Sequence, residues 1–575
     1  MPPLSYLLLP TLAMLSITHA GANAPSYLNS NNINNALPSS TLPAAQQQAI
    51  APAATLPQEQ QQTFTLNTLL QLDNVLIEGG SVYPFSEIAA VFNPYIGQEV
   101  TLGQLAMLTN RITQRYQDDG YALSYAVIPA QDLSQGQVRV ILVEGYISAH
   151  EMQGDIGKVE KQVSKLAAKL INERPLRKAS FERYTSLMAQ IPGVSLQANV
   201  PPPTTTDGAV TLITTGSRKG FTASSSISNS ADNDDVKILL SATSSSQTAL
   251  GEQVTVSTIL PPGDDKERYA RLDYSQFVGD EGTRLNTSVA GYRSKPGERD
   301  TINIENVPIE LATTGERKND RVSVGLTHPF IASSSESLTG SASLYAVNDE
   351  LDGAILASSS FGQEQLKFGN SSKVRALAVE GEWKQASAEQ LRVLGGGLYQ
   401  GLDVLGAESQ VRLADGSQFS PHDIHFLRAR LNALQQDAFT ERWIGVATGA
   451  LYWSEDSLPS SEQVLFGDRN FGRGYPAEQA YGDKGWGAGY ELGYQFYPGL
   501  TWLQLLQPYG AVDAARTRFN DNGQDANLAS YALGVRLSDL RHYNVALELA
   551  QPLADAPIDN DRRDPRLNFS INYNL

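Results

Sequence analysis

Beyond about residue 216, apolar and polar residues alternate one by one over segments of strand length. The last nine residues, 567–575, show this most clearly, with Asn and Ser on one face and apolar side chains on the other. The apolar face consists of Leu567, Phe569, Ile571, Tyr573 and Leu575. About sixteen such segments fit into residues 217–575, and strands of this kind stand between lipid and a wet lumen. We therefore expect a mainly β fold, a 16-stranded antiparallel transmembrane β-barrel closed by the strand 567–575.

The strands of a soluble β-sandwich also alternate, so alternation alone does not separate the two folds. The length of the strands favours the barrel. Aromatic residues near strand ends favour it too, because membrane barrels carry aromatic girdles at both interfaces; these residues are Trp453, Trp486 and Tyr497. The sequence also ends on its last strand, and a closed sheet leaves no unpaired edge in lipid.

Between residues 64 and 216 apolar residues instead recur at helical spacing between strand-like segments. In residues 64–146, Thr101 and Gln104 form a capping-box pair that begins a helix. Gly120 ends this helix, in the residue type that suits the position after a helix. The order is β-α-β-β, with strands expected at 72–77, 122–128 and 137–144. This order indicates one small α/β module.

Residues 147–216 indicate a second α/β module of similar size. Its first helix has an apolar face that runs from Val159 to Ile171, and Pro175 breaks the helical pattern. Ser180 can cap a second helix. Strands are expected at 195–200 and 209–215.

The first 22 residues have the features of a secretory signal peptide. An apolar run over residues 6–17 is too short to span a bilayer as a helix, and small residues follow it. Residues 23–63 are rich in Asn, Gln, Pro and Ala and cannot bury a core. We interpret them as a disordered linker and a candidate plug segment. The signal peptide predicts that the rest of the chain leaves the cytoplasm.

Composition narrows the chemistry that the chain can carry out. A net charge of −18 argues against a nucleic-acid partner, because nucleic-acid binding needs a basic face. The chain has no cysteine, which excludes disulfides, thiolate metal sites and cysteine nucleophiles. Its six His show neither a metal-like spacing nor a nearby Ser-His-Asp arrangement. We therefore expect no catalytic residue, no metal, no cofactor and no enzyme activity.

One connection in the barrel stands apart, the Gly-rich residues 454–484. It contains the run GDRNFGRGY, in which Arg473 is set among glycines and aromatic residues. An arginine can make paired hydrogen bonds to a carboxylate. In the following strand, alternation turns Asp513 towards the lumen, because a charge facing lipid is costly. We predict that the loop folds into the barrel and that Arg473 pairs with Asp513; a plain extracellular loop is the alternative.

GDRNFGRGY, followed by a Gly-rich aromatic strand, resembles the signature loop of the outer-membrane insertase and two-partner secretion superfamily. In that superfamily a Val-Arg-Gly-aromatic tetrad folds back into the barrel, where its Arg meets an Asp of the inner wall. Asp513 falls in the expected following strand. The first position of the tetrad departs from the usual Val, and the tetrad here is Gly472-Arg473-Gly474-Tyr475.

Residues 116–147 resemble the first POTRA domain of two-partner secretion transporters of the ShlB/FhaC/HecB type. The shared features are a Gly-Tyr after the helix, a Pro-x-Gln in the turn and a strand that ends in Val-Glu-Gly-x-Ile. The matching residues are Gly120, Tyr121, Pro129, Gln131, Glu144 and Gly145. We expect them mainly to shape the module. The family's architecture implies POTRA 1 at 64–146, POTRA 2 at 147–216 and a barrel at 217–575.

The resemblance implies an outer-membrane transporter with POTRA domains in the periplasm. Such a transporter recognises a large secreted partner, a β-helical adhesin or cytolysin, and passes it through the barrel. Its other partners would be outer-membrane lipids and the barrel-assembly machinery, which we expect to recognise the terminal strand. The alternative is an assembly factor that inserts other outer-membrane β-barrels. A passive porin would leave the two α/β modules unexplained.

Overall fold

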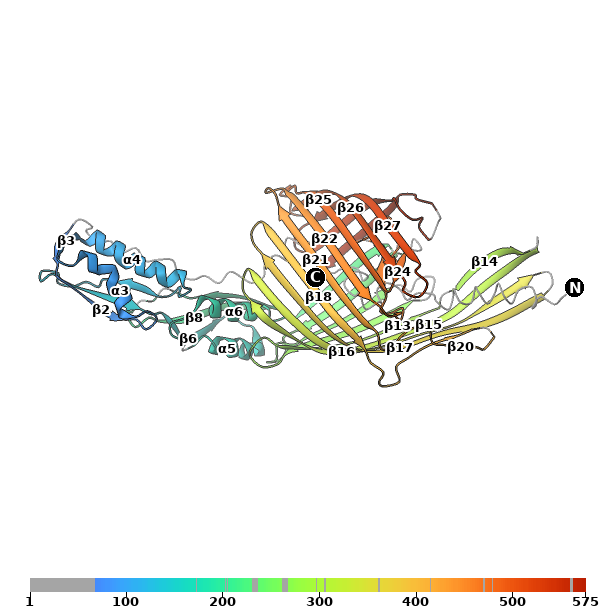
Figure 1. Cartoon of the computed structure of the whole chain (residues 1–575), viewed down its shortest axis with the longest axis horizontal. Helices are drawn as coiled ribbons and strands as arrows, with labels where there is room; N and C mark the ends of the chain where they lie inside the picture. The colour runs from blue at the N-terminus through green and yellow to red at the C-terminus, as the bar shows by residue number, and fades with distance from the viewer. Residues whose placement is uncertain are drawn as a thin grey trace.

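The computed structural model describes residues 68–575 apart from 172, 202, 204, 230–235, 261–266, 296, 305–306, 360–361, 414, 469–470, 478 and 559–561. The expected signal peptide (1–22) and the linker or plug segment (23–63) lie outside the described residues. Two small α/β modules lie at one end of the molecule and lead into a large barrel (Figure 1).

The first module contains two helices and two small sheets. Strand β2 runs parallel to β5, and β4 pairs antiparallel with β5. Helix α4 begins at the predicted capping box, in which Gln104 N–H donates to Thr101 Oγ1 (3.1 Å) and Thr101 N–H donates to Gln104 Oε1 (2.8 Å). The elements are β1 Leu69–Leu72, β2 Asn74–Gly79, α3 Phe85–Phe92, the 3₁₀ helix η2 Asn93–Tyr95, β3 Gln98–Thr101, α4 Leu102–Asp118, β4 Tyr125–Val127 and β5 Gln137–Val143.

Three features of this module differ from the prediction. The single strand expected at 72–77 is two strands, because β1 leaves the main sheet and pairs with β3. The strand expected at 122–128 is only the short β4. Helix α3 was not predicted: its N-cap is Pro84, which makes no side-chain capping bond, so no capping signal marks its start.

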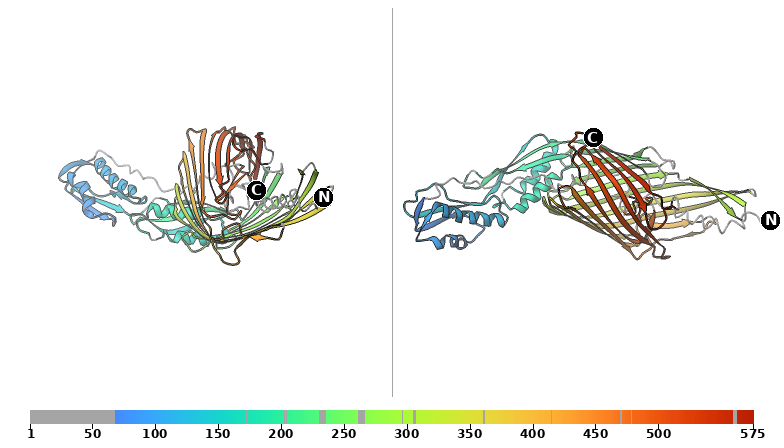
Figure 2. Two further views of the ribbon diagram at one scale, coloured as in Figure 1. Left: turned by 45° about the vertical axis from the view of Figure 1, so that its right-hand side comes forward. Right: turned by 90° about the horizontal axis from the view of Figure 1, so that it is seen from above.

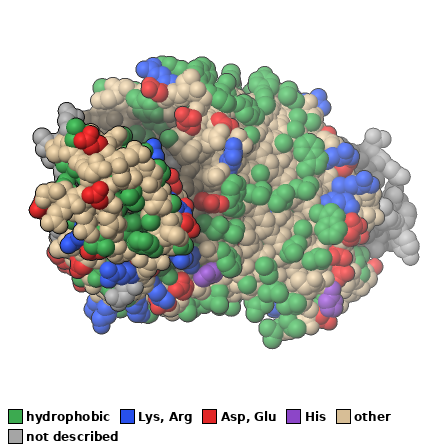
Figure 3. Space-filling model, turned by 60° about the vertical axis from the view of Figure 1, so that its left-hand side comes forward, with side chains coloured by type: hydrophobic (Ala, Val, Ile, Leu, Met, Phe, Trp, Pro, Cys, Tyr) green, Lys and Arg blue, Asp and Glu red, His purple; other side chains and the backbone are tan. Residues whose placement is uncertain are grey.

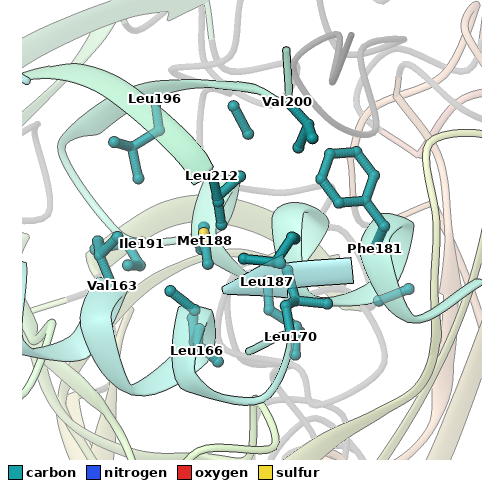
Figure 4. Close-up of a cluster of buried hydrophobic side chains, with 14 of the residues drawn as sticks. Val163, Leu166, Leu170, Phe181, Leu187, Met188, Ile191, Leu196, Val200 and Leu212 are labelled. Carbon is teal, nitrogen blue, oxygen red and sulfur yellow. The ribbon is translucent and has the colours of Figure 1, made fainter. Parts of the chain in front are cut away.

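In the second module β8 lies between the parallel strand β6 and the antiparallel strand β7. Side chains of both helices and of the sheet meet in one apolar core, shown in Figure 4 with Val163, Phe181 and Leu212 among its members. The second helix begins before the predicted cap Ser180, with Arg177 as N-cap, and β6 was not predicted. The elements are β6 Tyr146–Gln153, the 3₁₀ helix η3 Gly157–Val159, α5 Glu160–Ala168, α6 Lys178–Ala189, β7 Val194–Asn199 and β8 Ala209–Arg218.

The barrel has sixteen antiparallel strands within the described residues, as predicted, and β29 closes it by pairing with β9 (Figures 1 and 2). The wall strands are β9 Phe221–Asn229, β10 Val236–Ser245, β11 Gln253–Leu260, β12 Arg268–Phe277, β13 Arg284–Ser294, β15 Val307–Ala332, β16 Glu336–Ser359, β17 Gly362–Ala386, β18 Gln390–Gly401, β21 Leu427–Ala438, β22 Trp443–Ser454, β25 Lys484–Tyr494, β26 Leu505–Arg518, β27 Asp525–Ser538, β28 Tyr543–Pro552 and β29 Arg566–Asn574.

Three wall strands are much longer than a membrane requires. Strands β15, β16 and β17 have 26, 24 and 25 residues, whereas about 9–11 residues span a bilayer at barrel tilt. Their outer parts run beyond the rest of the barrel at the end far from the modules (Figure 1). Short strands extend this sheet, β14 Gly297–Ile304 beside β15, and β19 Glu408–Arg412 with β20 Gln418–Phe419 beside β17.

The two faces of the wall have opposite character, as the alternation predicts. On β26, Val512 is 56% exposed on the outer face, and its neighbour Asp513 is 6% exposed on the inner face. Hydrophobic side chains are spread over the outer face of the barrel (Figure 3). None of the helices in the described part of the chain is long and apolar enough to cross a membrane.

The second module is fixed to the barrel rim at several points. Only Lys219 and Gly220 separate β8 from the first wall strand, β9. In the turn between β12 and β13, Glu281 accepts from Lys169 Nζ at 2.9 Å. Arg183 donates to the carbonyl oxygens of Pro329 and Phe330, each at 3.1 Å. These contacts fix the second module at the barrel rim, and the first module extends away from it (Figure 1).

Candidate functional site: the loop inside the barrel

The inner loop, residues 455–483, connects β22 to β25 and folds into the lumen. It contains a hairpin of two short strands, β23 Val464–Phe466 and β24 Ala480–Gly482. Apolar loop side chains pack on lumen-facing Ala515 and Leu528 of the wall, and these loop residues are Val464, Phe466, Phe471, Tyr475 and Ala480. The loop is therefore a packed part of the lumen.

Arg473, at the tip of the inner loop, reaches carboxylates on separate wall strands. Its Nη1 lies 2.5 Å from Glu548 Oε2 on β28, and its Nη2 lies 3.1 Å from Glu491 Oε2 on β25. Its Nε lies 3.8 Å from Asp513 Oδ2 on β26. Glu491 also binds Arg536 of β27. One guanidinium thus ties the loop tip to several strands of an acidic wall.

Asp513 makes its shortest contact with the loop backbone. Gly472 N–H donates to Asp513 Oδ1 at 2.5 Å, and the Ser530 hydroxyl donates to the same oxygen at 2.8 Å. The structure thus brings Arg473 and Asp513 into one cluster, as the sequence analysis expected. The contacts of Arg473 with Glu548 and Glu491 are shorter than its contact with Asp513.

Glu491 and Glu548 were not among the candidates from the sequence, although alternation held a signal for both. Glu548 lies between Leu547 and Leu549, which are 42% and 53% exposed on the outer face. Glu491 shares its strand face with glycines. A carboxylate on the inner face of a wall strand can meet a loop cation, so every such residue is a candidate for docking.

The other members of the tetrad fit the loop backbone closely against the wall. Gly472 has φ +102°, a conformation that favours glycine and that aims its N–H at Asp513. A Cβ on Gly474 would lie 2.5–2.9 Å from backbone atoms of Gln551 and Pro552. The Tyr475 hydroxyl accepts from Ala554 N–H at 2.9 Å. The positive φ at Gly472 explains why Gly stands at the first position in place of Val.

The loop tip also contacts the strand that closes the barrel. Asn568 of β29 donates through Nδ2 to the Arg473 carbonyl at 3.0 Å and to Glu548 Oε1 at 3.2 Å. The closing pair is short, because β29 and β9 share five residue pairs within the described part of the chain. Docking of the loop therefore adds contacts next to the seam that has the fewest residue pairs within the described part of the wall.

Beside the loop the lumen contains a cavity of about 580 Å³. Phe471 of the loop forms one side of it, and the other side is the inner face of strands β15 to β22, with polar residues such as Thr339, Glu382 and Asn432. The cavity thus lies between the inner loop and the wall.

Glu144, in the first module, is a buried carboxylate with a complete set of donors. It accepts from Ser81 N–H (2.6 Å), Ser81 Oγ (2.7 Å), Val82 N–H (3.0 Å) and the Tyr116 hydroxyl (3.1 Å). Burial alone would raise the pKa of Glu144, but these hydrogen bonds outweigh burial and hold its pKa below the ordinary value. Glu144 thereby ties the loop after β2 to the end of β5.

Other residues of the POTRA signature stabilise turns and the end of a helix. The side-chain amide of Gln131 pairs with the backbone of Arg139 as a neighbouring strand would. It donates to Arg139 O (2.8 Å) and accepts from Arg139 N–H (2.7 Å). It also donates to the Pro129 carbonyl at 3.3 Å. Tyr121 N–H donates to Tyr116 O at 2.7 Å, which closes the end of α4.

The two signature glycines lie where the modules meet. Gly120 has φ +88°, and its carbonyl accepts from Lys178 N–H at 2.7 Å. The Gly145 carbonyl accepts from Leu176 N–H at 2.9 Å, and a Cβ on Gly145 would lie 2.5 Å from Leu123. They connect the first module to the second, a role that the sequence pattern did not indicate.

A closed 16-stranded barrel with two α/β modules at one rim and an inward-folded arginine loop defines a POTRA-barrel protein of the outer membrane. Family models agree in two places. The model "POTRA domain, ShlB-type" matches residues 70–145, and the model "Haemolysin secretion/activation protein ShlB/FhaC/HecB" matches residues 369–537.

Individual proteins resemble the chain over different lengths. The heme/hemopexin transporter protein HuxB of Haemophilus influenzae strain Rd is 22% identical over 494 residues, 82% of this chain and 81% of that protein. HuxB of strain 86-028NP is 25% identical over 202 residues, which span only 36% of that protein. The solved structure of CdiB from Escherichia coli matches with a TM-score of 0.65 at 16% identity, over 100% of both chains, and shows the same fold.

Over residues 70–145 and 369–537 the chain matches the ShlB/FhaC/HecB family of two-partner secretion transporters. It is an outer-membrane protein with its POTRA modules in the periplasm. The family consists of transporters that secrete partner proteins across the outer membrane.

Proposed function

We propose that this chain exports a large secreted protein, of the β-helical adhesin or cytolysin type, that its POTRA modules recognise in the periplasm. The observation that carries the proposal is the arrangement of modules, cavity and loop. The second module is fixed to the barrel rim, and the lumen contains the cavity. The inner loop forms one side of that cavity and packs on the wall. A chain received by the modules would enter the cavity and meet the loop.

The module sheets offer edges for an extended segment. Strand β6 is paired on one side by β8, and within the described residues its other side makes only the bridge from Ile147 to Ile171. Strand β7 is an edge as well. An exposed strand edge can bind an extended peptide by main-chain hydrogen bonds, which depend little on sequence. We propose that the partner docks on such an edge before it enters the lumen.

Folding of the partner outside the cell would drive net export. A partner that folds once it has emerged cannot return through the lumen as an extended chain, because unfolding it costs its stability. This drive requires no catalytic residue in the transporter, and we infer none. In the same scheme Arg473 and Asp513 position the loop. The barrel-assembly machinery recognises β29 during biogenesis, outer-membrane lipids surround the wall, and nucleic acid is not a partner.

Deleting both modules tests this proposal. Cells that express the barrel without residues 69–215 should place it in the outer membrane but should fail to secrete the partner encoded beside it. Immunoblots of culture medium and membranes measure the two quantities, with the full chain as positive control. Continued secretion would contradict the proposal. Normal secretion of the partner together with missing outer-membrane barrels would favour the assembly-factor alternative.

A further inference from the structure

The base of the inner loop carries a second ion pair that is more deeply buried than the one at its tip. Glu462 Oε2 lies 2.7 Å from Arg428 Nη2 and accepts from Arg428 Nε at 2.9 Å. The Tyr345 hydroxyl donates to the same oxygen at 2.8 Å. The side chains of Arg428 and Glu462 are 3% and 0% exposed. The Arg428 guanidinium also lies 3.6 Å from the ring centroid of Tyr399.

The two ends of the loop are attached to different strands of the wall. Glu462 binds β21 and β16, through Arg428 and Tyr345. Arg473 binds β25, β26 and β28, beside the closing strand β29. The loop is therefore held at two places along the wall by ion pairs of opposite sense. Its anion meets Arg428, with Arg321 also lying against Tyr345, and its cation meets carboxylates.

A contribution to stability alone does not account well for the ion pair of Glu462 and Arg428 at the base of the loop. Replacing a buried ion pair by apolar side chains of similar size is often neutral or stabilising, whereas breaking the pair on one side is costly. The ion pair of Glu462 and Arg428 thus contributes less to stability than to fixing the position of the inner loop, which carries Glu462. Within the described residues, the only regular structure of this loop is the short hairpin β23–β24.

We propose that Glu462 is a second positioning residue of the inner loop, and that it and Arg473 are two latches on different strands of the wall. Release of either latch leaves the loop held by the other, and only release of both opens the full width of the lumen. Only the purpose of the two latches rests on the proposed export function. The two latches themselves can be measured without any partner.

Because the chain has no cysteine, a single introduced thiol can report on the loop. Ala480 in β24 is 1% exposed and differs from Cys by one atom, so Ala480→Cys gives a buried reporter. A membrane-impermeant maleimide added to whole cells should label it slowly. Glu462→Gln in this background should raise the labelling rate on the order of ten-fold or more, because a buried guanidinium then lacks its anion.

A matched control is available in the wall. Asp273 accepts from its strand neighbour Arg271 through both Nε (2.8 Å) and Nη2, and neither residue belongs to the loop. Asp273→Asn should leave the labelling rate at the parent value. Heat-modifiable migration of the folded barrel on gels shows that each variant has assembled. The charge exchange Glu462→Arg with Arg428→Glu is the second variant, and it should return the rate towards the parent.

Combining Glu462→Gln with Arg473→Ala tests whether two latches or only one hold the inner loop. In planar bilayers the double variant of the full chain should show open-channel events far more often than either single variant. Equal labelling in Glu462→Gln and Asp273→Asn would overturn the proposal. So would conductance in the double variant no higher than in Arg473→Ala alone. Neither outcome depends on the partner, so the export function could fail or hold independently.

Discussion

Replacing Arg473 with alanine should abolish most export while the barrel still reaches the outer membrane. The substitution leaves Glu491, Asp513 and Glu548 without the guanidinium that they share. Removing one partner of a buried pair costs about 3–5 kcal/mol. Even about 3 kcal/mol would shift the docked fraction of the loop tip by roughly two orders of magnitude. We expect the secreted partner to fall roughly ten-fold or more by immunoblot of the culture medium.

The control for this variant is an arginine on a neighbouring strand outside the cluster. Arg516 forms an ion pair with Asp525 at the outer end of β26 and β27, and both side chains are exposed. Exposed pairs contribute little to stability, so Arg516→Ala should secrete as the parent does. Normal secretion by Arg473→Ala at parental barrel levels would show that the loop tip has no role in export.

A side chain at Gly474 should have an effect of similar size through shape alone. The atoms that a Cβ would meet are backbone atoms of Gln551 and Pro552, which cannot rotate away as a side chain can. Gly474→Val therefore prevents the loop from lying against β28 while it leaves every charge of the cluster in place. We expect export to fall as far as in Arg473→Ala. Secretion per assembled barrel, measured on the same blots, is the quantity to compare.

Gly381 supplies the matched control for Gly474. It lies in β17, and a Cβ there would meet only Thr339 O at 3.9 Å, an ordinary contact. Gly381→Val should therefore secrete normally. If Gly474→Val also secretes normally, close packing of the loop on the wall has no part in export.

The sequence predicts the barrel well because its signal is local and repeated. Each wall strand alternates by itself, as Leu547, Glu548 and Leu549 show. The closing strand is also recognisable, since its outward Leu567 and inward Asn568 follow the same rule. Two-residue periodicity needs no knowledge of the neighbouring strand. Strand number and membrane-facing residues therefore follow from the sequence.

The partners of Arg473 do not follow from the sequence, because they depend on which strands meet across the lumen. Glu548 lies 75 residues from Arg473, on a wall strand three strands beyond the one that follows the loop. The partners of Glu462 at the base of the loop are harder still to predict, since Glu462 and Tyr345 are 117 residues apart. Alternation shows that a residue faces the lumen. Which inward residue touches the loop is a property of the closed barrel.

The first module shows a similar limit on a smaller scale. The sequence marks Glu144 through its resemblance to a known pattern, but its donors Ser81 and Val82 lie more than sixty residues earlier. Helix α3 escaped prediction because it begins after Pro84 without a side-chain cap. Helix α4, which has a full capping box, begins where it was predicted, whereas α6 begins before its predicted cap Ser180.

The central claim is that the inner loop must dock correctly and must also move for export, and a reversible lock on the loop tests it most directly. A Cβ on Gly487 of β25 would lie 2.5 Å from Phe471 Cγ, which places the two Cβ positions within about 4 Å, the distance that a disulfide requires. Phe471→Cys with Gly487→Cys is therefore expected to form a bond in this cysteine-free chain. The measurement is secretion of the partner before and after a reductant. Export should stop while the disulfide is formed and resume when it is reduced. Equal export in both states would contradict the claim that the loop must move.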